Sequence, residues 1–331
     1  MTTSTDTTTS TGTTRAARST PGSRRRTRRR YLVVAAFMSP WIVGFLALYV
    51  YPMLASLYYS FTKYSGGKEA PRWTGLSNYN FMFTKDPNFW ISLRNTFWIV
   101  AVSVPLSIVV GVGCAYVLTK PHRGRAFYRT AFFLPTMVPA VAAAVAFLFL
   151  LNAGGPIDHI LGFLHLPQPL WFLDAQWSKP GLVVLGLWGI GSTMIIFLAA
   201  LLNVPAHLYE AADIEGANAW QKLRHITLPM ISPVIFFTAV IGIIYGFQYF
   251  TEAYVVGSSV GGAAGGSSTT LGSPQGSTLF YTIWLYQQGF EAFHLGYASA
   301  MAWMLFAIVM ACTLVLIKTS NRWVFYQGGF R

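Results

Sequence analysis

The sequence is short of charge and nearly free of cysteine. Only 10% of its 331 residues are charged, whereas 54% are hydrophobic and 16% are aromatic. A soluble domain has about 25% charged residues, so this chain lacks the side chains that keep a globular surface in water. The hydrophobic fraction is too high for a disordered chain, and two cysteines cannot frame a disulfide scaffold or, by their spacing to histidine, a metal site. These absences predict an integral membrane protein.

Charge is missing above all from six long apolar windows of 20 to 23 residues. Each is long enough to cross about 30 Å of hydrocarbon at about 1.5 Å per residue. None contains Asp, Glu, Lys, Arg or His, and a charge at the centre of a span costs about 2.5–3.5 kcal/mol. We therefore predict an all-α integral membrane protein with six transmembrane helices. The predicted spans are residues 32–51, 96–118, 131–151, 181–202, 230–250 and 297–317.

The basic residues are distributed unevenly between the connections. The two termini and the 119–130 and 203–229 connections hold 17 Lys and Arg, and the other three connections hold 6. The positive-inside rule then places both termini in the cytoplasm, which requires an even number of spans. The net charge of +13 does not indicate nucleic-acid binding, because the run from Arg24 to Arg30 directly adjoins an apolar span that it would orient.

Two regions follow from this pattern. Residues 1–30 begin with a Thr- and Ser-rich stretch, so we predict a disordered basic cytoplasmic tail there. Residues 31–331 form the predicted transmembrane domain. The first apolar stretch is too long for the apolar region of a cleaved signal peptide, which favours a retained helix.

The connection from residue 203 to 229 differs from an ordinary short turn. Residues 206–214 are good helix formers, Gly216 permits a reversal of the backbone, and residues 218–226 can form a second short helix. Pro229 would close the stretch and begin the fifth span. We expect a compact helical hairpin that docks a soluble partner. Its apolar residues are expected to form a packed face: Leu208, Ala211, Ala212, Ile214, Trp220, Leu223 and Ile226.

This hairpin resembles the "EAA" signature of the membrane-spanning subunits of bacterial binding-protein-dependent ABC importers. The pattern consists of Glu210-Ala211-Ala212, Gly216 four residues later, and Ile226-x-Leu228-Pro229 after nine more residues. Further segments are similar to the sugar-permease branch, which includes maltose, lactose and glycerol-phosphate types. They are Gly75-Leu76-x-Asn78-Tyr79, Ala131-Phe132-Phe133-Leu134-Pro135, Tyr286-Gln287-Gln288-x-Phe290 and Gly296-Tyr297-Ala298-Ser299-Ala300.

The resemblance implies the type I ABC importer permease fold in a bacterial cytoplasmic (inner) membrane, and a coupling helix that sits in a cleft of an ATPase subunit. Glu210 would offer a carboxylate to that ATPase, and Gly216 would supply the turn. The implied partners are two ATPase subunits, a homologous second permease, and an extracytoplasmic solute-binding protein. The chain has no GxxxxGK[ST] phosphate loop, so ATP and magnesium are expected on the ATPase. The implied coupling residues are Glu210, Ala211, Ala212, Asp213, Gly216, Leu228 and Pro229.

The spans also suggest what is carried. A proton-coupled carrier needs a titratable group in its pathway, and an anionic solute would be expected to meet Arg or Lys there; the predicted spans have neither. A neutral mono- or oligosaccharide needs hydroxyl, amide and aromatic partners, and five side chains of spans four and five offer them or, alternatively, serve as packing and interfacial side chains. The maltose-type resemblance implies sugar contacts at Gln248 and Tyr249 and in the segment from Trp188 to Thr193. An ion- or proton-coupled sugar carrier and a glycerol-phosphate permease remain as alternatives, whereas an enzyme is not indicated. The five residues are Trp188, Thr193, Tyr245, Gln248 and Tyr249.

Overall fold

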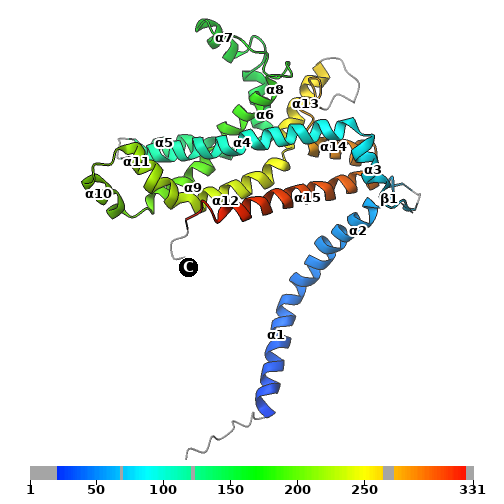
Figure 1. The fold of residues 1–331 in the computed structure, drawn as a ribbon. Coiled ribbons are helices and arrows are strands. Elements are labelled where there is room, and N and C mark those ends of the chain that lie inside the picture. Colours follow the sequence, from blue (N-terminus) through cyan, green and yellow to red (C-terminus); the bar gives the residue numbers. More distant parts are fainter. Residues whose placement is uncertain (1–20, 68–69, 121–123, 264–271, 326–331) are drawn as a thin grey trace, which may run out of the picture. The chain divides into compact units, whose positions relative to one another are not determined.

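The computed structural model describes residues 21–67, 70–120, 124–263 and 272–325 (Figure 1). The chain divides into two compact units, Met1–Ser56 and Leu57–Arg331.

The first unit is helical throughout its described residues. Helix α1 (Pro21–Phe45) continues through a π-helical turn, η1 (Leu46–Val50), into α2 (Tyr51–Ser60). Because α1 already begins at Pro21, residues 21–30 are not the disordered tail that the composition predicted. Arginine is a good helix former, and the apolar segment that follows lets the helix extend backwards through the basic run. Residues 1–20 lie outside the described part of the chain.

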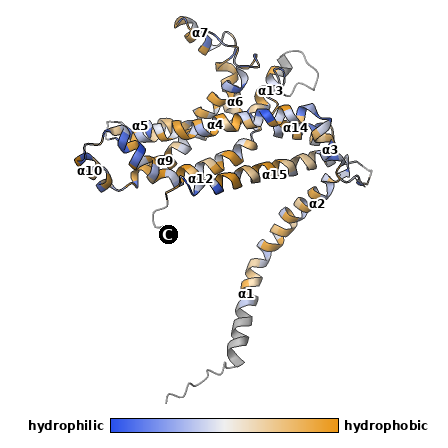
Figure 2. Cartoon of the chain, in the orientation of Figure 1, coloured by the Kyte–Doolittle hydropathy of each residue, from blue (hydrophilic) through white to orange (hydrophobic). Residues whose placement is uncertain are grey.

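Three long helices run lengthwise through the second unit (Figure 1). They are α4 (Pro87–Thr119), α12 (Leu228–Phe247) and α15 (Leu295–Ser320). Helix α12 packs against both α4 and α15. The middle of these helices is hydrophobic and their ends are more polar (Figure 2), as expected for segments surrounded by hydrocarbon. The predicted spans 96–118 and 297–317 lie inside α4 and α15.

The third and fourth predicted spans are bent helix pairs. Helix α5 (Arg125–Phe133) and the 3₁₀ turn η2 (Leu134–Met137) meet α6 (Ala140–Leu150) at 101°, and α8 (Ser178–Trp188) meets α9 (Gly191–Leu202) at 53°. Pro139 causes the first break, because a proline disfavours helical geometry in the residue before it, and Val138 is extended.

The described residues contain four helices long and apolar enough to cross a membrane, or up to six if each bent pair is one span. The predicted count of six therefore depends on counting α5–α6 and α8–α9 as single spans. One candidate, Val33–Ser60, continues nine residues past the predicted end of span one. Another, Ala219–Val260, contains the predicted fifth span 230–250.

The remaining elements are short. Strands β1 (Thr62–Lys63) and β2 (Arg72–Trp73) pair antiparallel, with Thr62 opposite Trp73. The other elements of the second unit are α3 (Ser77–Thr84), α7 (Pro156–Phe163), α13 (Thr251–Ala263), α14 (Tyr281–Tyr286) and the π-helical turn η4 (Gln287–Glu291).

Asp86 organises the end of the second unit where α3, α14 and the start of α15 meet. Its carboxylate is buried and caps α4 by accepting hydrogen bonds from the backbone N–H groups of Asn88 and Phe89. The second carboxylate oxygen accepts hydrogen bonds from Trp284 Nε1 at 2.7 Å and from the Tyr297 hydroxyl. This one side chain therefore ties the start of α4 to α14 and α15.

Buried hydrogen bonds one to three turns further along α4 complete the connection. Asn95 Nδ2 donates to the Leu279 carbonyl at 2.9 Å, and Thr96 Oγ1 accepts the backbone N–H of Tyr281 at 2.9 Å. The Tyr281 hydroxyl donates to the Met301 carbonyl at 2.8 Å. Burial raises the pKa of Tyr281, which keeps its hydroxyl protonated as a donor. We call Asp86, Asn95, Thr96, Tyr281, Trp284 and Tyr297 the distal network.

Two segments that resemble sugar-permease motifs also meet at this end. Asn78 Nδ2 donates to the carbonyls of Ser60 and Thr62 at 2.8 and 2.9 Å. The backbone N–H of Gly296 donates to the Tyr64 carbonyl at 3.0 Å, and a Cβ at Gly296 would lie 2.1 Å from the Thr62 carbonyl oxygen. These motifs hold the segment after α2 against the start of α15.

Candidate functional site

The hairpin predicted from the sequence is present at the opposite end of the second unit (Figure 1). Its first helix, α10, runs Ala206–Ile214, as predicted. Its second arm is α11 (Ala219–Lys222), a π-helical turn η3 (Leu223–Thr227), and then α12 without a break. The predicted boundary at Pro229 is therefore wrong. A proline inside a continuous helix removes one backbone hydrogen bond, and the π-helical turn η3 comes directly before Pro229 at this point.

The turn between the two arms is built around Gly216. This residue has φ of +75°, a conformation that glycine adopts without steric cost. The Gly216 N–H donates to the Asp213 carbonyl at 3.1 Å, and the Ala217 N–H donates to the Ala212 carbonyl at 2.9 Å. This is the Schellman arrangement that ends a helix. The EAA residues Ala212 and Asp213 thus contribute backbone carbonyls as well as side chains.

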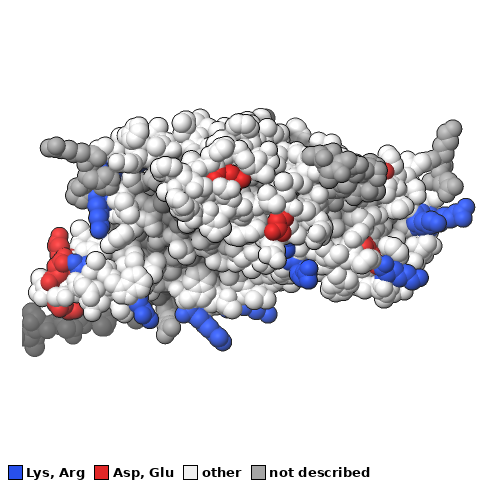
Figure 3. Space-filling view, turned by 90° about the horizontal axis from the view of Figure 1, so that it is seen from above, with Lys and Arg blue, Asp and Glu red and all other residues white. Residues whose placement is uncertain are grey.

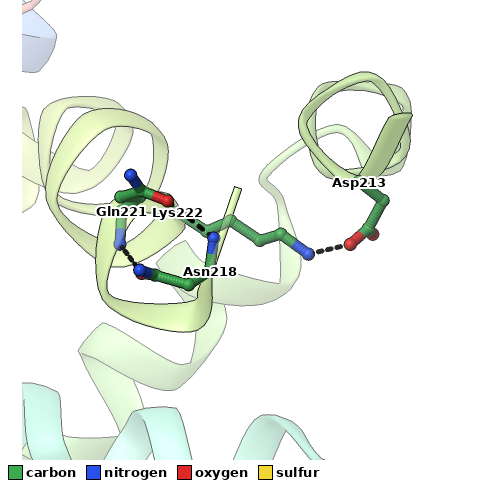
Figure 4. Close-up of polar contacts among 4 residues, drawn as sticks. All are labelled: Asp213, Asn218, Gln221 and Lys222. Atoms are coloured by element: carbon green, nitrogen blue, oxygen red, sulfur yellow. Dashed lines mark hydrogen bonds and ion pairs between the residues drawn. The ribbon is translucent and has the colours of Figure 1, made fainter. Parts of the chain in front are cut away.

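A capping box starts the second arm (Figure 4). The Asn218 side chain accepts the Gln221 N–H at 2.9 Å, and the Gln221 side chain accepts the Asn218 N–H at 2.7 Å. Such reciprocal bonds satisfy two backbone donors that the helix leaves free. The short α11 therefore begins at a defined residue.

Two side-chain contacts join the arms. The Lys222 ammonium forms an ion pair with the Asp213 carboxylate across the turn (Figure 4). The Tyr209 hydroxyl is hydrogen-bonded to Oγ1 of the buried Thr227 at 2.9 Å. Leu228 packs against the apolar cluster of α4, α9 and α12, so it anchors the hairpin to the bundle. These contacts connect the hairpin to the start of α12.

The outer surface of the hairpin is both acidic and apolar. Glu210, Ala211 and Glu215 are exposed, and Ile214 and Trp220 are 88% and 66% exposed. The prediction that Ala211, Ile214 and Trp220 pack inside the hairpin is therefore wrong, whereas Leu208, Ala212, Leu223 and Ile226 are half-buried. Acidic side chains gather at this end, while the middle of the visible face carries few charges (Figure 3). Exposed aliphatic and aromatic side chains beside carboxylates are typical of a protein-binding surface.

A second feature is a cavity of about 180 Å³ between α4, α8 and α12. Glycines on α12 are needed where this helix approaches α4. Cβ atoms added to Gly242 and Gly246 would lie only 3.1 Å from Val104 and 2.9 Å from Val100, so larger side chains would crowd the wall of the cavity. Its walls are uncharged, and its polar side chains are two serines and one tyrosine. The lining residues are Ile99, Val100, Ser103, Val104, Ser107, Leu182, Val183, Gly186, Leu187, Gly242, Gly246 and Tyr249.

The structure brings one of the five predicted pathway residues into this cavity. Tyr249 lines it, and its hydroxyl is buried without a hydrogen-bond partner among the described residues. Gln248 and Tyr245 lie nearby in sequence but are exposed at the C-terminal end of α12. Trp188 packs against Phe147 with the two rings tilted by 57° and their centroids 5.6 Å apart. The remaining predicted residue, Thr193, faces α4 at the position of Gly111, where its methyl would lie 3.1 Å from an added Cβ.

Sequence reasoning missed the contribution of α4. Ser103 and Ser107 line the cavity one turn apart, in a stretch that was interpreted only as a membrane span. The available signal was the combination of these hydroxyls with the Gly242-x-x-x-Gly246 spacing on α12, since small residues four apart let two membrane helices approach closely.

Comparisons with known proteins agree with this geometry. Residues 103–325 match the family model described as "Binding-protein-dependent transport system inner membrane component". The chain is 41% identical over 306 residues to the probable ABC transporter permease protein YesP of Bacillus subtilis, covering 92% of this chain and 95% of that protein. It is 30% identical to the arabinooligosaccharides transport system permease protein AraP of B. subtilis, covering 86% and 87%. It is also 30% identical to the lactose transport system permease protein LacF of Rhizobium radiobacter, covering 86% and 93%.

A solved structure has the same fold. It is a bacterial ABC transporter involved in the import of the acidic polysaccharide alginate, which aligns with a TM-score of 0.71 at 21% identity and covers 90% of this chain and 98% of the other. The relatives are membrane-spanning transport components and not enzymes. The chain belongs to the family of inner membrane components of binding-protein-dependent transport systems, and it has the ABC importer permease fold.

Proposed function

We propose that this chain is the permease subunit of an ATP-driven saccharide importer in the bacterial cytoplasmic membrane. The observation that carries the proposal is the hairpin Ala206–Thr227, a rigid element with exposed carboxylates and exposed Ile214 and Trp220 at one end of an apolar bundle. Relatives that carry names of sugar transport systems, AraP and LacF, support a saccharide as the substrate.

The hairpin is the proposed contact with an ATPase subunit. Glu210 would pair with a cationic side chain of the ATPase, and Ile214 and Trp220 would fill an apolar part of its cleft. Because Tyr209–Thr227 and Asp213–Lys222 hold the hairpin to the start of α12, a displacement of the hairpin is transmitted to α12. ATP closes the ATPase pair, and the bundle alternates between inward- and outward-open states. ATP and magnesium belong to the ATPase.

The cavity is the proposed contact with the sugar. The Tyr249 hydroxyl and the hydroxyls of Ser103 and Ser107 offer hydrogen bonds in an otherwise apolar space. A buried hydroxyl group without a hydrogen-bond partner lowers the stability of the fold, and a ligand that forms a hydrogen bond with it removes this cost. The lining residues carry no charge, which favours a neutral mono- or oligosaccharide over glycerol phosphate. We propose that Gln248, Tyr245 and Trp188 contact the sugar on its way to or from this cavity.

The complete transporter requires further chains. We propose two ATPase subunits, a homologous second permease that completes the pathway, and an extracytoplasmic solute-binding protein that delivers the sugar. The family is defined as one component of a binding-protein-dependent system, which supports this assembly over an ion- or proton-coupled carrier acting alone.

Reconstitution tests the proposal. The chain, copurified with its neighbouring subunits and placed in proteoliposomes with the binding protein, should take up the sugar only when ATP is enclosed with the ATPase. Uptake driven by a proton gradient without an ATPase would contradict it. In the same vesicles, Tyr249→Phe and Gln248→Ala should lower uptake at unchanged subunit composition. Tyr51→Phe is the matched control for removing a tyrosine hydroxyl, because this side chain is 72% exposed and does not line the cavity.

A further inference from the structure

A second, apolar groove lies between α4 and α5, away from the sugar cavity. Its volume is about 680 Å³, which is within the range of small-molecule sites. Gly113 leaves space in its wall, because a Cβ added there would have no atom within 4 Å. The wall also contains one of the two cysteines of the chain. The lining residues are Val110, Gly113, Cys114, Val117, Leu118, Tyr128 and Phe132.

Three cations lie where α4 stops and α5 starts, close in sequence to the groove residues Leu118 and Tyr128. Lys120 caps the C-terminus of α4, and Arg125 and Arg129 lie on the first turns of α5. Residues 119–133 contain no Asp or Glu. Because side chains three, four and seven apart share a helix face, Arg125 and Arg129 lie on the same side of α5 as the groove residues Tyr128 and Phe132.

Arg125 has an unmet hydrogen-bonding requirement at this point. Its Nε atom is buried and has no hydrogen-bond partner among the described residues. A buried donor without an acceptor costs about 1–3 kcal/mol, and guanidinium groups are well matched to phosphate oxygens. The groove therefore combines an apolar channel with a cationic donor at its polar end.

We propose that this groove binds an anionic phospholipid. The acyl chain lies along Val110, Gly113, Cys114 and Val117, and the phosphate accepts a hydrogen bond from Arg125. Lys120 and Arg129 add electrostatic attraction for the anionic headgroup. Basic pockets between membrane helices near the cytoplasmic surface are known to favour anionic headgroups. The charge around the groove argues for a lipid over a second permease chain, since three cations without a carboxylate suit a phosphate better than an apolar helix.

Cys114 provides a direct reporter of occupancy. We would delipidate the purified complex of the Cys312→Ser variant, so that Cys114 is the one thiol of this chain, and follow its modification by N-ethylmaleimide. At phosphatidylglycerol concentrations several times its Kd, modification should slow by at least about threefold. Phosphatidylcholine should not have this effect. The converse variant, Cys114→Ser, reports Cys312 on α15, where neither lipid should change the rate.

Two variants separate the headgroup from the acyl chain. Arg125→Gln should abolish protection of Cys114 by phosphatidylglycerol, whereas Lys318→Gln, which removes a cation in the last turn of α15, should not. Gly113→Leu fills the groove and should reduce by one the number of phosphatidylglycerol molecules retained in native mass spectrometry. Equal protection by both lipids, protection that persists in Arg125→Gln, or a Cys114 that stays unreactive in the delipidated complex would each overturn the proposal. The last result would assign the groove to a subunit interface.

Discussion

The two ends of the helical bundle use polar side chains in opposite ways. At the α3–α14 end, the distal network is buried, and the four hydrogen bonds to Asp86 come from groups of this chain itself. At the hairpin end, Glu210 and Glu215 are exposed and lie beside the exposed Ile214 and Trp220. A carboxylate satisfied inside the chain stabilises the fold, whereas exposed carboxylates next to exposed apolar side chains are available to another protein.

Substitutions at the two ends should therefore change different measured properties, stability at one end and transport at the other. Changes in the distal network should lower the stability of the chain, and any loss of transport should follow from loss of protein. Changes on the hairpin surface should leave stability intact and reduce the work transmitted from the ATPase.

Asp86→Ala should destabilise the chain by at least about 3 kcal/mol. The substitution leaves the Trp284 Nε1 and Tyr297 hydroxyl donors buried without an acceptor, at about 1–3 kcal/mol each, and removes the cap of α4. Thermal unfolding of the purified complex measures the loss. Asp174→Ala is the matched control, because the one hydrogen bond found for the Asp174 side chain among the described residues is local, to the Gln176 N–H at 3.0 Å. An unchanged melting temperature for Asp86→Ala would show that the buried carboxylate does not stabilise the fold, and the two ends would then not differ in this respect.

The double variant Glu210→Ala/Gly216→Val should reduce ATP-driven uptake by about tenfold or more, equivalent to about 1.4 kcal/mol of lost coupling. Valine is strained at the φ of +75° observed at Gly216, so the hairpin can no longer present its surface. The melting temperature of the bundle should change little. Gly44→Ala is the control, because a Cβ at Gly44 has no atom within 4 Å and its φ is not positive.

Tyr209→Phe should lower uptake to a smaller degree, because it removes one of two side-chain contacts between the hairpin arms. A hydrogen bond of this kind contributes about 0.5–1.5 kcal/mol, so uptake should fall several-fold at normal expression. Thr227→Val removes the same contact from the other side and also the hydrogen bond that Thr227 Oγ1 donates to the Lys222 carbonyl at 3.2 Å, so its loss should be at least as large. In the double variant the losses should not add, because both substitutions remove the same hydrogen bond. Additive losses would show that the Tyr209–Thr227 hydrogen bond does not contribute to coupling.

Asp213→Asn should have the smallest effect. The Asp213 side chain is 64% exposed, and ion pairs of this exposure contribute about 0–1 kcal/mol. Uptake measured at low and high salt should differ less in the variant than in the original chain, since salt screens the pair that the variant lacks. A severe loss of uptake would instead assign Asp213 to the partner contact.

The hairpin could be predicted almost completely from the sequence because its determinants are local. The helix formers of Ala206–Ile214, the glycine at 216 and the cap at Asn218 each act within a few residues. The error at Ile214 and Trp220 has a physical cause: an apolar pattern shows that a side chain needs a partner, but not that the partner is on another chain.

The bends and the interior were less predictable, because they depend on contacts between distant segments. The donors to Asp86 include two side chains about 200 positions away, and no spacing rule connects them. Similarly, the cavity combines Ser103 and Ser107 of α4 with Gly246 and Tyr249, near the end of α12. The composition could establish membrane helices, but their mutual packing decides which hydroxyls face a common space.

The proposed coupling is tested most directly by identifying the subunit that the hairpin surface contacts in the assembled transporter. A photo-reactive amino acid at position 214, which is 88% exposed, should crosslink to the ATPase subunit in intact cells. The same group at position 245, which is 69% exposed on α12, should crosslink to lipid or to a membrane subunit. Adducts between position 214 and the extracytoplasmic binding protein, with none to the ATPase, would contradict the account.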